Sequence, residues 1–274
     1  MIIATDLDGT LISSDTSISN ENLGAIKRLS EYGAHIVLVT GRTFYEILPQ
    51  LTDCPYIDYF VYSNGACIYK QGSGLAFSNC MPASAALSIY DIFNSYKTFV
   101  ELYTHGKPLV DKSKFCDSGF EFYKISPAFL PELKRSRIPV ENLNAEMEKN
   151  AADIEMFDVF FADANERLEC RKRIETEFPD FQITTSLDNN LEVMNQGVNK
   201  GTGIKKLCEI AGYDLNDIVA FGDSKNDITM FEAIENSYAV SNACPELKKI
   251  SKGIACSNDE NIMLWAENKF YGSK

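Results

Sequence analysis

Long hydrophobic runs, histidine and paired cysteines are all scarce in this chain of 274 residues. No apolar run approaches the roughly 20 residues that span a bilayer, which argues against a transmembrane protein. The chain has 2 histidines, and its 8 cysteines show no Cys-x-x-Cys spacing. A zinc site or a disulfide framework is therefore not indicated, and we interpret the cysteines as small hydrophobic side chains in a reducing compartment.

Basic residues are also outnumbered. Lys and Arg total 26 against 39 Asp and Glu, which gives a formal net charge of −13. Nucleic acids and anionic membranes are bound through basic patches, so neither is an expected partner. Asp6 and Asp8 follow directly behind the first apolar residues, a pattern that suits neither a signal peptide nor a transit peptide. We therefore expect a cytoplasmic protein.

The two ends of the chain share a strand–helix rhythm. Apolar runs such as Ile2–Thr5 and Ile218–Phe221 indicate buried strands, with segments of helical spacing between them. This alternation is typical of a doubly wound, Rossmann-like parallel sheet. We predict an α/β core formed by residues 1–81 and 188–274, in which the parallel-sheet rhythm resumes near Leu191.

Residues 82–187 interrupt this rhythm. Strands are predicted at Phe120–Lys124 and Ile154–Phe161, and helical patterns at Ala83–Ser95 and Asn165–Phe178. Paired strands with two longer helices favour an α+β insertion over a continuation of the parallel sheet. The length of the chain, 274 residues, also exceeds the usual size of one domain.

Asp6 and Asp8 come at the end of the first predicted strand. A spacing of two places both side chains on the same side of an extended segment. Two carboxylates this close share either a proton or a metal ion, and Mg²⁺ accepts one or two carboxylates together with a phosphate oxygen. We interpret Asp6 as a nucleophile that takes up a phosphoryl group and Asp8 as the general acid and base. The alternative is an Asx turn after an edge strand.

Thr40-Gly41-Arg42 follows another apolar run. A hydroxyl group, a glycine amide and the first amides of a helix predicted over 44–51 would form a phosphate-binding cradle. Such a turn is common and carries little weight alone. Lys200 begins a later predicted helix. It is either a solvated surface lysine or a cation that neutralises the charge on the oxygens of a transferring phosphoryl group.

A second acidic stretch, Gly222-Asp223-Ser224-Lys225-Asn226-Asp227, ends the apolar run at Ile218–Phe221. Open α/β sheets bind ligands at the carboxyl ends of their strands, so Asp223 is expected to reach the same crevice as Asp6. We assign Asp223 to the metal and Asp227 to its inner or outer shell. Asn226 is expected to contact phosphate or to support these ligands. Helix capping is an alternative for Asp227, but it does not explain Asp223 together with Asn226.

These four stretches resemble the motifs of the haloacid dehalogenase-like superfamily of phosphohydrolases. The large insertion between the second and third motifs resembles the Cof-type branch, subclass IIB, as do Ser63-Asn64-Gly65-Ala66 and Asn242-Ala243. The resemblance implies a Rossmann-like core, a mobile α+β cap of the C2B type at 82–187, Mg²⁺ and hydrolysis of small phosphomonoesters. It implies Asp6 and Asp223 as side-chain metal ligands with the Asp8 backbone carbonyl as a third. We also expect Asn64 and Gly65 to contact phosphate or substrate.

The sequence thus predicts a Mg²⁺-dependent phosphatase that acts on sugar phosphates or related small phosphorylated metabolites. An acidic chain that binds phosphate esters needs a cation to offset repulsion, which agrees with the predicted metal. One alternative is a phosphomutase, in which the phosphoryl group on Asp6 returns to a sugar. Another is a non-catalytic regulator that binds a phosphorylated metabolite, although Asp6, Asp8, Lys200 and Asp223 together disfavour it.

Overall fold

A computed structural model describes residues 1–127 and 129–272 of the chain. They form two compact units, each made from separate stretches of the sequence. The first unit contains Met1–Gly41, Ile47–Phe77 and the chain from Asn199 onward, and the second contains Arg42–Glu46 and Ser78–Val198. Among the described helices, none combines the length and the apolar character needed to cross a membrane.

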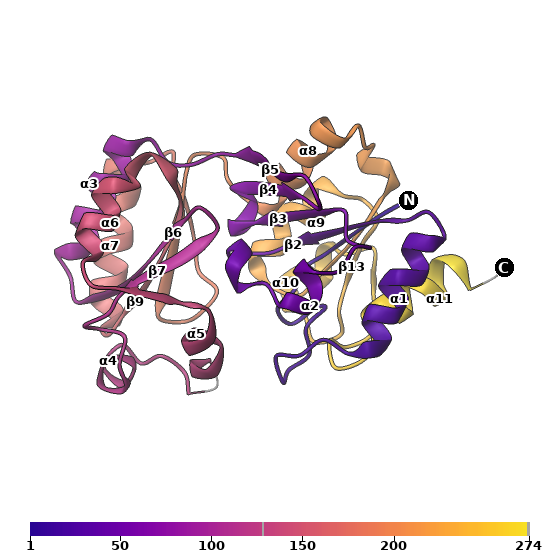
Figure 1. The fold of residues 1–274 in the computed structure, drawn as a ribbon, viewed down its shortest axis with the longest axis horizontal. Coiled ribbons are helices and arrows are strands. Elements are labelled where there is room, and N and C mark those ends of the chain that lie inside the picture. Colours follow the sequence, from indigo (N-terminus) through magenta and orange to yellow (C-terminus); the bar gives the residue numbers. More distant parts are fainter. Residues whose placement is uncertain (128, 273–274) are drawn as a thin grey trace. The chain divides into compact units, whose positions relative to one another are not determined.

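The first unit is organised around an eight-stranded sheet of order β14-β13-β12-β1-β2-β3-β4-β5 (Figure 1). From β14 to β3 all neighbours are parallel, and β4 pairs antiparallel with β3. Numbered along the chain, the parallel strands follow the Rossmann order 3-2-1-4-5-6, which confirms the predicted doubly wound core. The strands are β1 Ile2–Thr5, β2 His35–Val39, β3 Tyr59–Tyr62, β4 Cys67–Lys70, β5 Gly74–Ser78, β12 Ile218–Gly222, β13 Ser237–Ala239 and β14 Gly253–Ile254.

The strands at the centre of this sheet are apolar along their whole length. All residues of β1 and β12 are buried, as expected for parallel strands that are covered on both faces. Helix α1 begins after Ser19, whose side chain accepts a hydrogen bond from the Asn22 amide, and it packs beside α11 (Figure 1). The helices of this unit are α1 Asn20–Glu31, α2 Pro49–Thr52, α8 Lys200–Ala211, α9 Ile228–Ala233, α10 Pro245–Ile250 and α11 Ile262–Tyr271, with 3₁₀ turns at Ser63–Gly65, Leu215–Asp217 and Lys225–Asp227.

The second unit contains a six-stranded sheet of order β10-β11-β9-β6-β7-β8. Its described pairs are antiparallel except β7 with β8. The strands are β6 Thr98–Thr104, β7 Lys107–Asp111, β8 Ile138–Val140, β9 Ile154–Phe161, β10 Gln182–Thr184 and β11 Asn190–Met194. The helices are α3 Ala83–Asn94, α4 Asp117–Phe122, α5 Leu130–Ser136, α6 Leu143–Lys149 and α7 Ala164–Glu177, with 3₁₀ turns at Phe44–Glu46 and Ala151–Asp153.

Successive residues along a strand of this sheet point to opposite faces and pack against different side chains. On β6, Val100 and Leu102 join a hydrophobic core with residues of α3, α6 and α7, which lie together beside the sheet (Figure 1). The alternating residue Phe99 packs in a smaller cluster with Phe120 and Leu133. Glu101 lies between Val100 and Leu102 in sequence, so its side chain points to the other face of the sheet.

Three predicted elements differ from the structure. The segment Phe120–Lys124 is not a strand, because Phe120 belongs to helix α4. The predicted helix over 44–51 is a 3₁₀ turn followed by the four-residue helix α2. The expected return to the parallel sheet at 188, near Leu191, comes later, since β11 pairs antiparallel with β9 in the second sheet and the first unit resumes at Asn199.

A buried arginine links three elements of the second unit. Arg137 contacts Glu46 in the 3₁₀ turn at 2.5 Å and Glu101 on β6 at 2.7 Å. The side chains of Arg137, Glu46 and Glu101 are 2%, 4% and 0% exposed. Burial alone would lower the pKa of Arg137, but the charges of Glu101 and Glu46 outweigh this effect and hold the pKa above its usual range. The guanidinium therefore stays charged and ties Arg42–Glu46 to the second sheet.

We predict that Arg137→Met strongly destabilises the protein. The substitution preserves much of the side-chain volume but leaves two buried carboxylates without their cation, which is expected to lower the free energy of unfolding by about 3–5 kcal/mol. Urea denaturation measures this loss. Lys112→Met is the control, because the ion pair of Lys112 with Glu141 is exposed and is expected to matter little. Equal losses in the two variants would contradict the prediction.

Candidate active site

The candidate site begins where two central strands of the first sheet end. β1 and β12 are neighbours, with Thr5 paired to Phe221, and the Asp6 amide donates to the Phe221 carbonyl at 3.0 Å. The strand order reverses between β1 and β12, and ligands of doubly wound sheets bind at such a reversal. Asp6 and Asp223 follow these strands directly, so the fold itself places them at the same end of the sheet.

Lys200 lies at the centre of the charged groups. Its ammonium donates to Asp6 Oδ1 at 2.7 Å and to Asp227 Oδ1 at 2.6 Å. The Lys200 side chain is 1% exposed, so it is not a solvated surface lysine. Burial alone would lower the pKa of Lys200, but the charges of Asp227 and Asp6 raise it above its usual value. Lys200 therefore places a positive charge between two carboxylates.

Close backbone packing determines the position of Lys200. It is the first residue of α8, and the Asn199 side chain caps this helix by accepting from the Thr202 amide. A Cβ on Gly65 would lie 2.4 Å from the Asn199 carbonyl oxygen, and one on Gly203 would lie 2.7 Å from Val61 Cγ1. Only glycine allows the start of α8 to approach β3 and the following turn this closely. Gly203 was not singled out from the sequence. Glycine is unfavourable inside a helix, so its presence there could have indicated a close backbone contact.

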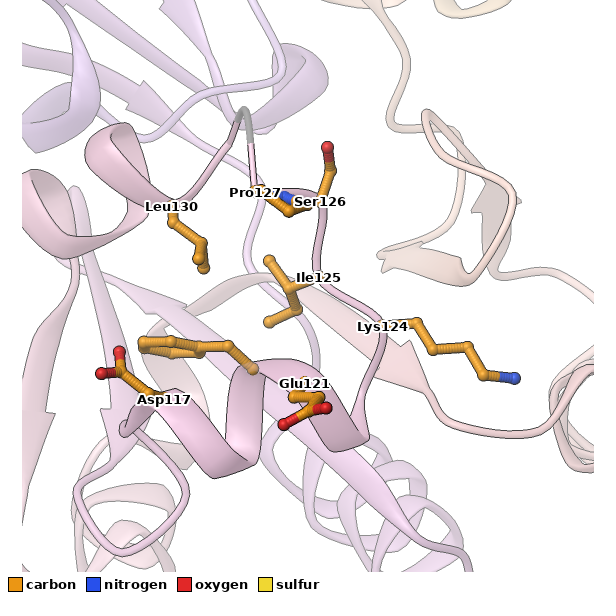
Figure 2. Close-up of a pocket in the computed structure, with 8 residues that line it drawn as sticks. Asp117, Glu121, Lys124, Ile125, Ser126, Pro127 and Leu130 are labelled. Atoms are coloured by element: carbon orange, nitrogen blue, oxygen red, sulfur yellow. The ribbon is translucent and has the colours of Figure 1, made fainter.

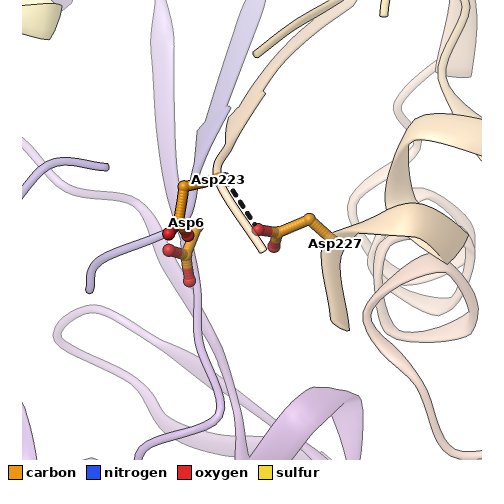
Figure 3. A group of neighbouring side chains, drawn as sticks. All are labelled: Asp6, Asp223 and Asp227. Atoms are coloured by element: carbon orange, nitrogen blue, oxygen red, sulfur yellow. Dashed lines mark hydrogen bonds between the residues drawn. The ribbon is translucent and has the colours of Figure 1, made fainter. Parts of the chain in front are cut away.

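Three carboxylates gather around this lysine. Ligand oxygens of Asp6, Asp223 and Asp227 all lie within 4.8 Å of one another (Figure 3). Asp227 Oδ2 accepts hydrogen bonds from the amides of Asp223 at 2.9 Å and Ser224 at 3.0 Å. Both oxygens of Asp227 are thus already bonded. By contrast, Asp223 Oδ1 is buried and has no hydrogen-bond partner among the described residues.

The electrostatics of the group favour a further cation. Burial raises the pKa of Asp6 well above its usual range, even though Lys200 opposes the shift. Burial and the charge of Asp227 raise the pKa of Asp223 to about 7. One ammonium thus does not balance three carboxylates. Oxygen atoms from two or three carboxylates are a donor set that suits Mg²⁺, and the unpartnered Asp223 Oδ1 is consistent with such an ion.

Asp8 has different surroundings from Asp6. Its residue is exposed whereas Asp6 is buried, and its carboxylate is not part of the group of three. The turn after it is held by the Leu7 carbonyl, which accepts from the Ile12 amide at 2.8 Å. Gly9 adopts a φ of +71°, and a Cβ there would lie 2.5 Å from Asp223 Oδ2. The turn at Gly9 therefore brings the backbone against Asp223.

Thr40 and Gly41 lie at the end of β2, the next strand of the sheet. Thr40 is buried, its amide donates to the Val61 carbonyl, and its carbonyl accepts from the Asn64 amide at 3.0 Å. Asn226 Nδ2 donates to Asn64 Oδ1 at 3.3 Å. Five residues that the sequence predicted for the site are thus neighbours in the first unit, namely Thr40, Gly41, Asn64, Gly65 and Asn226.

Arg42 itself belongs to the second unit, and its partners lie in the same unit. Its guanidinium donates to the Glu46 carbonyl at 2.7 Å and to Glu132 at 3.3 Å. Arg135 also donates to the Glu46 carbonyl, at 3.0 Å. The contribution of Arg42 to phosphate binding stays a prediction. The contact with Glu132 could not be predicted from local sequence, because Glu132 is 90 residues away along the chain.

A separate pocket of about 400 Å³ lies within the second unit. Ile125 and Leu130 face each other across it, and Asp117, Glu121 and Lys124 stand around its rim (Figure 2). None of its lining residues belongs to the four motifs. The pocket therefore carries no information about the chemistry of the acidic group.

Comparison with known proteins agrees with this geometry. The family model for haloacid dehalogenase-like hydrolases matches residues 3–264. The chain belongs to this family. It is 28% identical over 272 residues to the Bacillus subtilis 5-amino-6-(5-phospho-D-ribitylamino)uracil phosphatase YwtE, with 94% of each chain covered.

Solved structures of haloacid dehalogenase-like hydrolases share the fold. One from Bacteroides thetaiotaomicron superposes with a TM-score of 0.81 at 21% identity and covers 98% of this chain and 99% of its own. The subclass IIB sugar phosphatase BT4131 superposes with a TM-score of 0.78 at 20% identity, with 98% of both chains covered. The chain is thus a hydrolase whose relatives carry the name phosphatase.

We predict that Gly203→Ala lowers the hydrolysis of an aryl phosphate by this enzyme. The new methyl group would lie 2.8 Å from Gly65 Cα, so α8 must shift and carry Lys200 with it. Misplacement by about 1 Å is expected to reduce the rate about 100-fold.

Gly24→Ala in α1 is the matched control, because its methyl group would meet only the flexible end of Arg28, at 3.2 Å. It is expected to retain full activity. Unchanged activity in Gly203→Ala would show that α8 does not need this close approach.

Proposed function

We propose that this hydrolase is a Mg²⁺-dependent phosphatase that cleaves small phosphomonoesters through an aspartyl-phosphate on Asp6. The observation that carries the proposal is the position of Asp6, which lies buried at the strand-order reversal, bonded to Lys200 and beside Asp223. Phosphoryl transfer requires mainly positioning and charge stabilisation, and this arrangement offers both. Relatives named as phosphatases support the same reaction class.

In this proposal Asp6 attacks the phosphorus atom and the alcohol leaves. Lys200 holds the Asp6 carboxylate in position and offsets the negative charge that builds on the phosphoryl oxygens. Asp8 gives a proton to the departing alkoxide and later removes one from the water that hydrolyses the aspartyl-phosphate. Its exposure suits a group that must meet substrate and water. Thr40 and the Gly41 amide are the proposed phosphate contacts.

Asp6 and Asp223 are the proposed side-chain ligands of Mg²⁺, with the Asp8 backbone carbonyl as a third. When bound, the ion would neutralise phosphate charge and favour the ionised forms of both carboxylates. The unpartnered Asp223 Oδ1 supports this assignment. The two oxygens of Asp227 are occupied by Lys200 and by two amides. We therefore propose that Asp227 orients Lys200 and the Asp223 backbone, and acts on the metal from its outer shell.

The decisive experiment replaces Asp6. With Mg²⁺ present, Asp6→Asn is expected to lower aryl phosphate hydrolysis by about 1,000-fold or more, because an amide is not a nucleophile. Asp8→Asn should also lose turnover but still bind Mg²⁺ and phosphate. Asp53→Asn is the matched control, since Asp53 is exposed and outside the motifs. Substantial single-turnover hydrolysis by Asp6→Asn would rule out the covalent route.

Mg²⁺ titration distinguishes Asp223 from Asp227. Loss of a residue that supports a metal ligand typically weakens metal binding about 10- to 100-fold. Asp223→Asn removes a direct ligand, so its Mg²⁺ affinity should fall by more than about 100-fold. For Asp227→Asn the loss of Mg²⁺ affinity should stay within the range of about 10- to 100-fold. Its kcat should fall, because Lys200 loses one of its two carboxylate partners. Calorimetry in the absence of substrate measures both affinities. Equal losses would place Asp227 in the inner shell.

The substrate class we propose is small phosphorylated metabolites, including sugar phosphates. BT4131 is named a sugar phosphatase, and YwtE is named for a phosphoribitylamino-uracil. A phosphomutase remains the alternative within enzymes, and it would isomerise a sugar phosphate without releasing phosphate. A binding regulator would show no Mg²⁺-dependent turnover. A cytoplasmic location and the lack of nucleic-acid or membrane partners remain predictions from composition and charge.

A further inference from the structure

The turn Ser63–Gly65 has an unusual backbone. Its residues have φ values of +48°, +53° and +101°, so two consecutive residues with a Cβ are left-handed. L-residues other than glycine rarely adopt this conformation, although asparagine tolerates it best. All three residues are buried. Strained backbone of this kind persists only where the surrounding structure holds it, and it is concentrated at functional sites.

Asn64 touches two of the motif segments. Its amide donates to the Thr40 carbonyl at 3.0 Å, and its side-chain Oδ1 accepts from Asn226 Nδ2 at 3.3 Å. The side chain also lies directly over Gly41, where an added Cβ would come 3.2 Å from Oδ1 and 3.4 Å from Nδ2. A single amide group thus separates the Thr40–Gly41 loop from the turn that carries Asn226.

The next residue of the same turn contacts a third motif. Gly65 packs against the Asn199 carbonyl, which immediately precedes Lys200. The turn Ser63–Gly65 therefore lies between the loop at Thr40, the start of α8 and the turn at Asn226. A shift of this turn would change the spacing between the proposed phosphate cradle and Lys200. Asn64 is 2% exposed, which leaves little of its surface for a substrate.

We propose that Asn64 is a positioning residue that sets the distance between the Thr40–Gly41 loop and Asn226, instead of the substrate contact that the sequence suggested. The left-handed backbone at Asn64 aims its side chain over Gly41 and toward Asn226. The inference rests on the proposed phosphatase function. It predicts that loss of the amide group misaligns the transition state while ground-state binding is retained.

The variant Asn64→Gly separates the side chain from the backbone. Glycine adopts the same φ without strain, so the turn is retained and only the amide group is lost. We expect kcat for an aryl phosphate to fall about 10- to 100-fold, with KM within about threefold of the parent enzyme. A kcat within about twofold of the parent, or a raised KM alone, would overturn the proposal.

Lys124→Gly is the matched control. Lys124 also has a positive φ, of 54°, but it is exposed and outside the motifs, so both constants should be unchanged. If Asn64→Gly fails to fold, Asn226→Ala provides the second test, because it removes the Nδ2 donor that bonds to Asn64 Oδ1. The same fall in kcat is expected for it, and an unchanged kcat would overturn the proposal.

A double-mutant cycle tests the link to Asn226. If Asn64 acts through this contact, Asn64→Gly combined with Asn226→Ala should be no slower than the slower single variant. Independent, additive losses would overturn the link.

If the parent enzyme shows no hydrolysis, the proposed function fails by itself. The positioning role of Asn64 is then tested by measuring the binding of orthovanadate and of inorganic phosphate in the presence of Mg²⁺. Asn64→Gly should weaken vanadate binding about tenfold, with phosphate binding nearly unchanged. Equal effects on the two anions would overturn the positioning role.

Discussion

The buried ammonium of Lys200 is the interaction on which the rest of the site depends. A charge without solvent is stable only when opposite charges and hydrogen bonds surround it. Asp6 and Asp227 meet this need at 2.7 and 2.6 Å. Each of the three groups belongs to a different part of the first unit, namely the end of β1, the start of α8 and the turn after β12. The ion pairs therefore hold these segments together as well as tuning the site.

Close packing around this charge is the second constraint. Gly65 and Gly203 allow α8 to approach within distances that any side chain would block. Asp227 uses one oxygen for Lys200 and the other for the amides of Asp223 and Ser224. As a result, Asp223 has little freedom to move away from Asp6. An excess of negative charge remains, and a divalent cation is the simplest group that balances it.

The sequence predicted the core of the fold better than the inserted unit. Buried parallel strands such as Ile218–Gly222 are continuous apolar runs, which are visible without the structure. Phe120 and Tyr123 were expected in a strand, but they share one side of a helical segment and pack in the same cluster as Leu133. Strand β11, Asn190–Met194, alternates polar and apolar residues over most of its length, which is typical of antiparallel pairing, and its partner β9 places it in the second sheet.

What the sequence alone determined is the chemistry at the strand ends. Asp6, Thr40 and Asp223 each follow an apolar strand, and parallel strands bring their carboxyl ends to one edge, so their proximity follows from local patterns. The tertiary structure decided what lies against these groups. It gave Arg42 a partner at Glu132, and it placed Asn64 between Gly41 and Asn226. Such contacts join residues far apart in sequence, and no local pattern encodes which segments will meet.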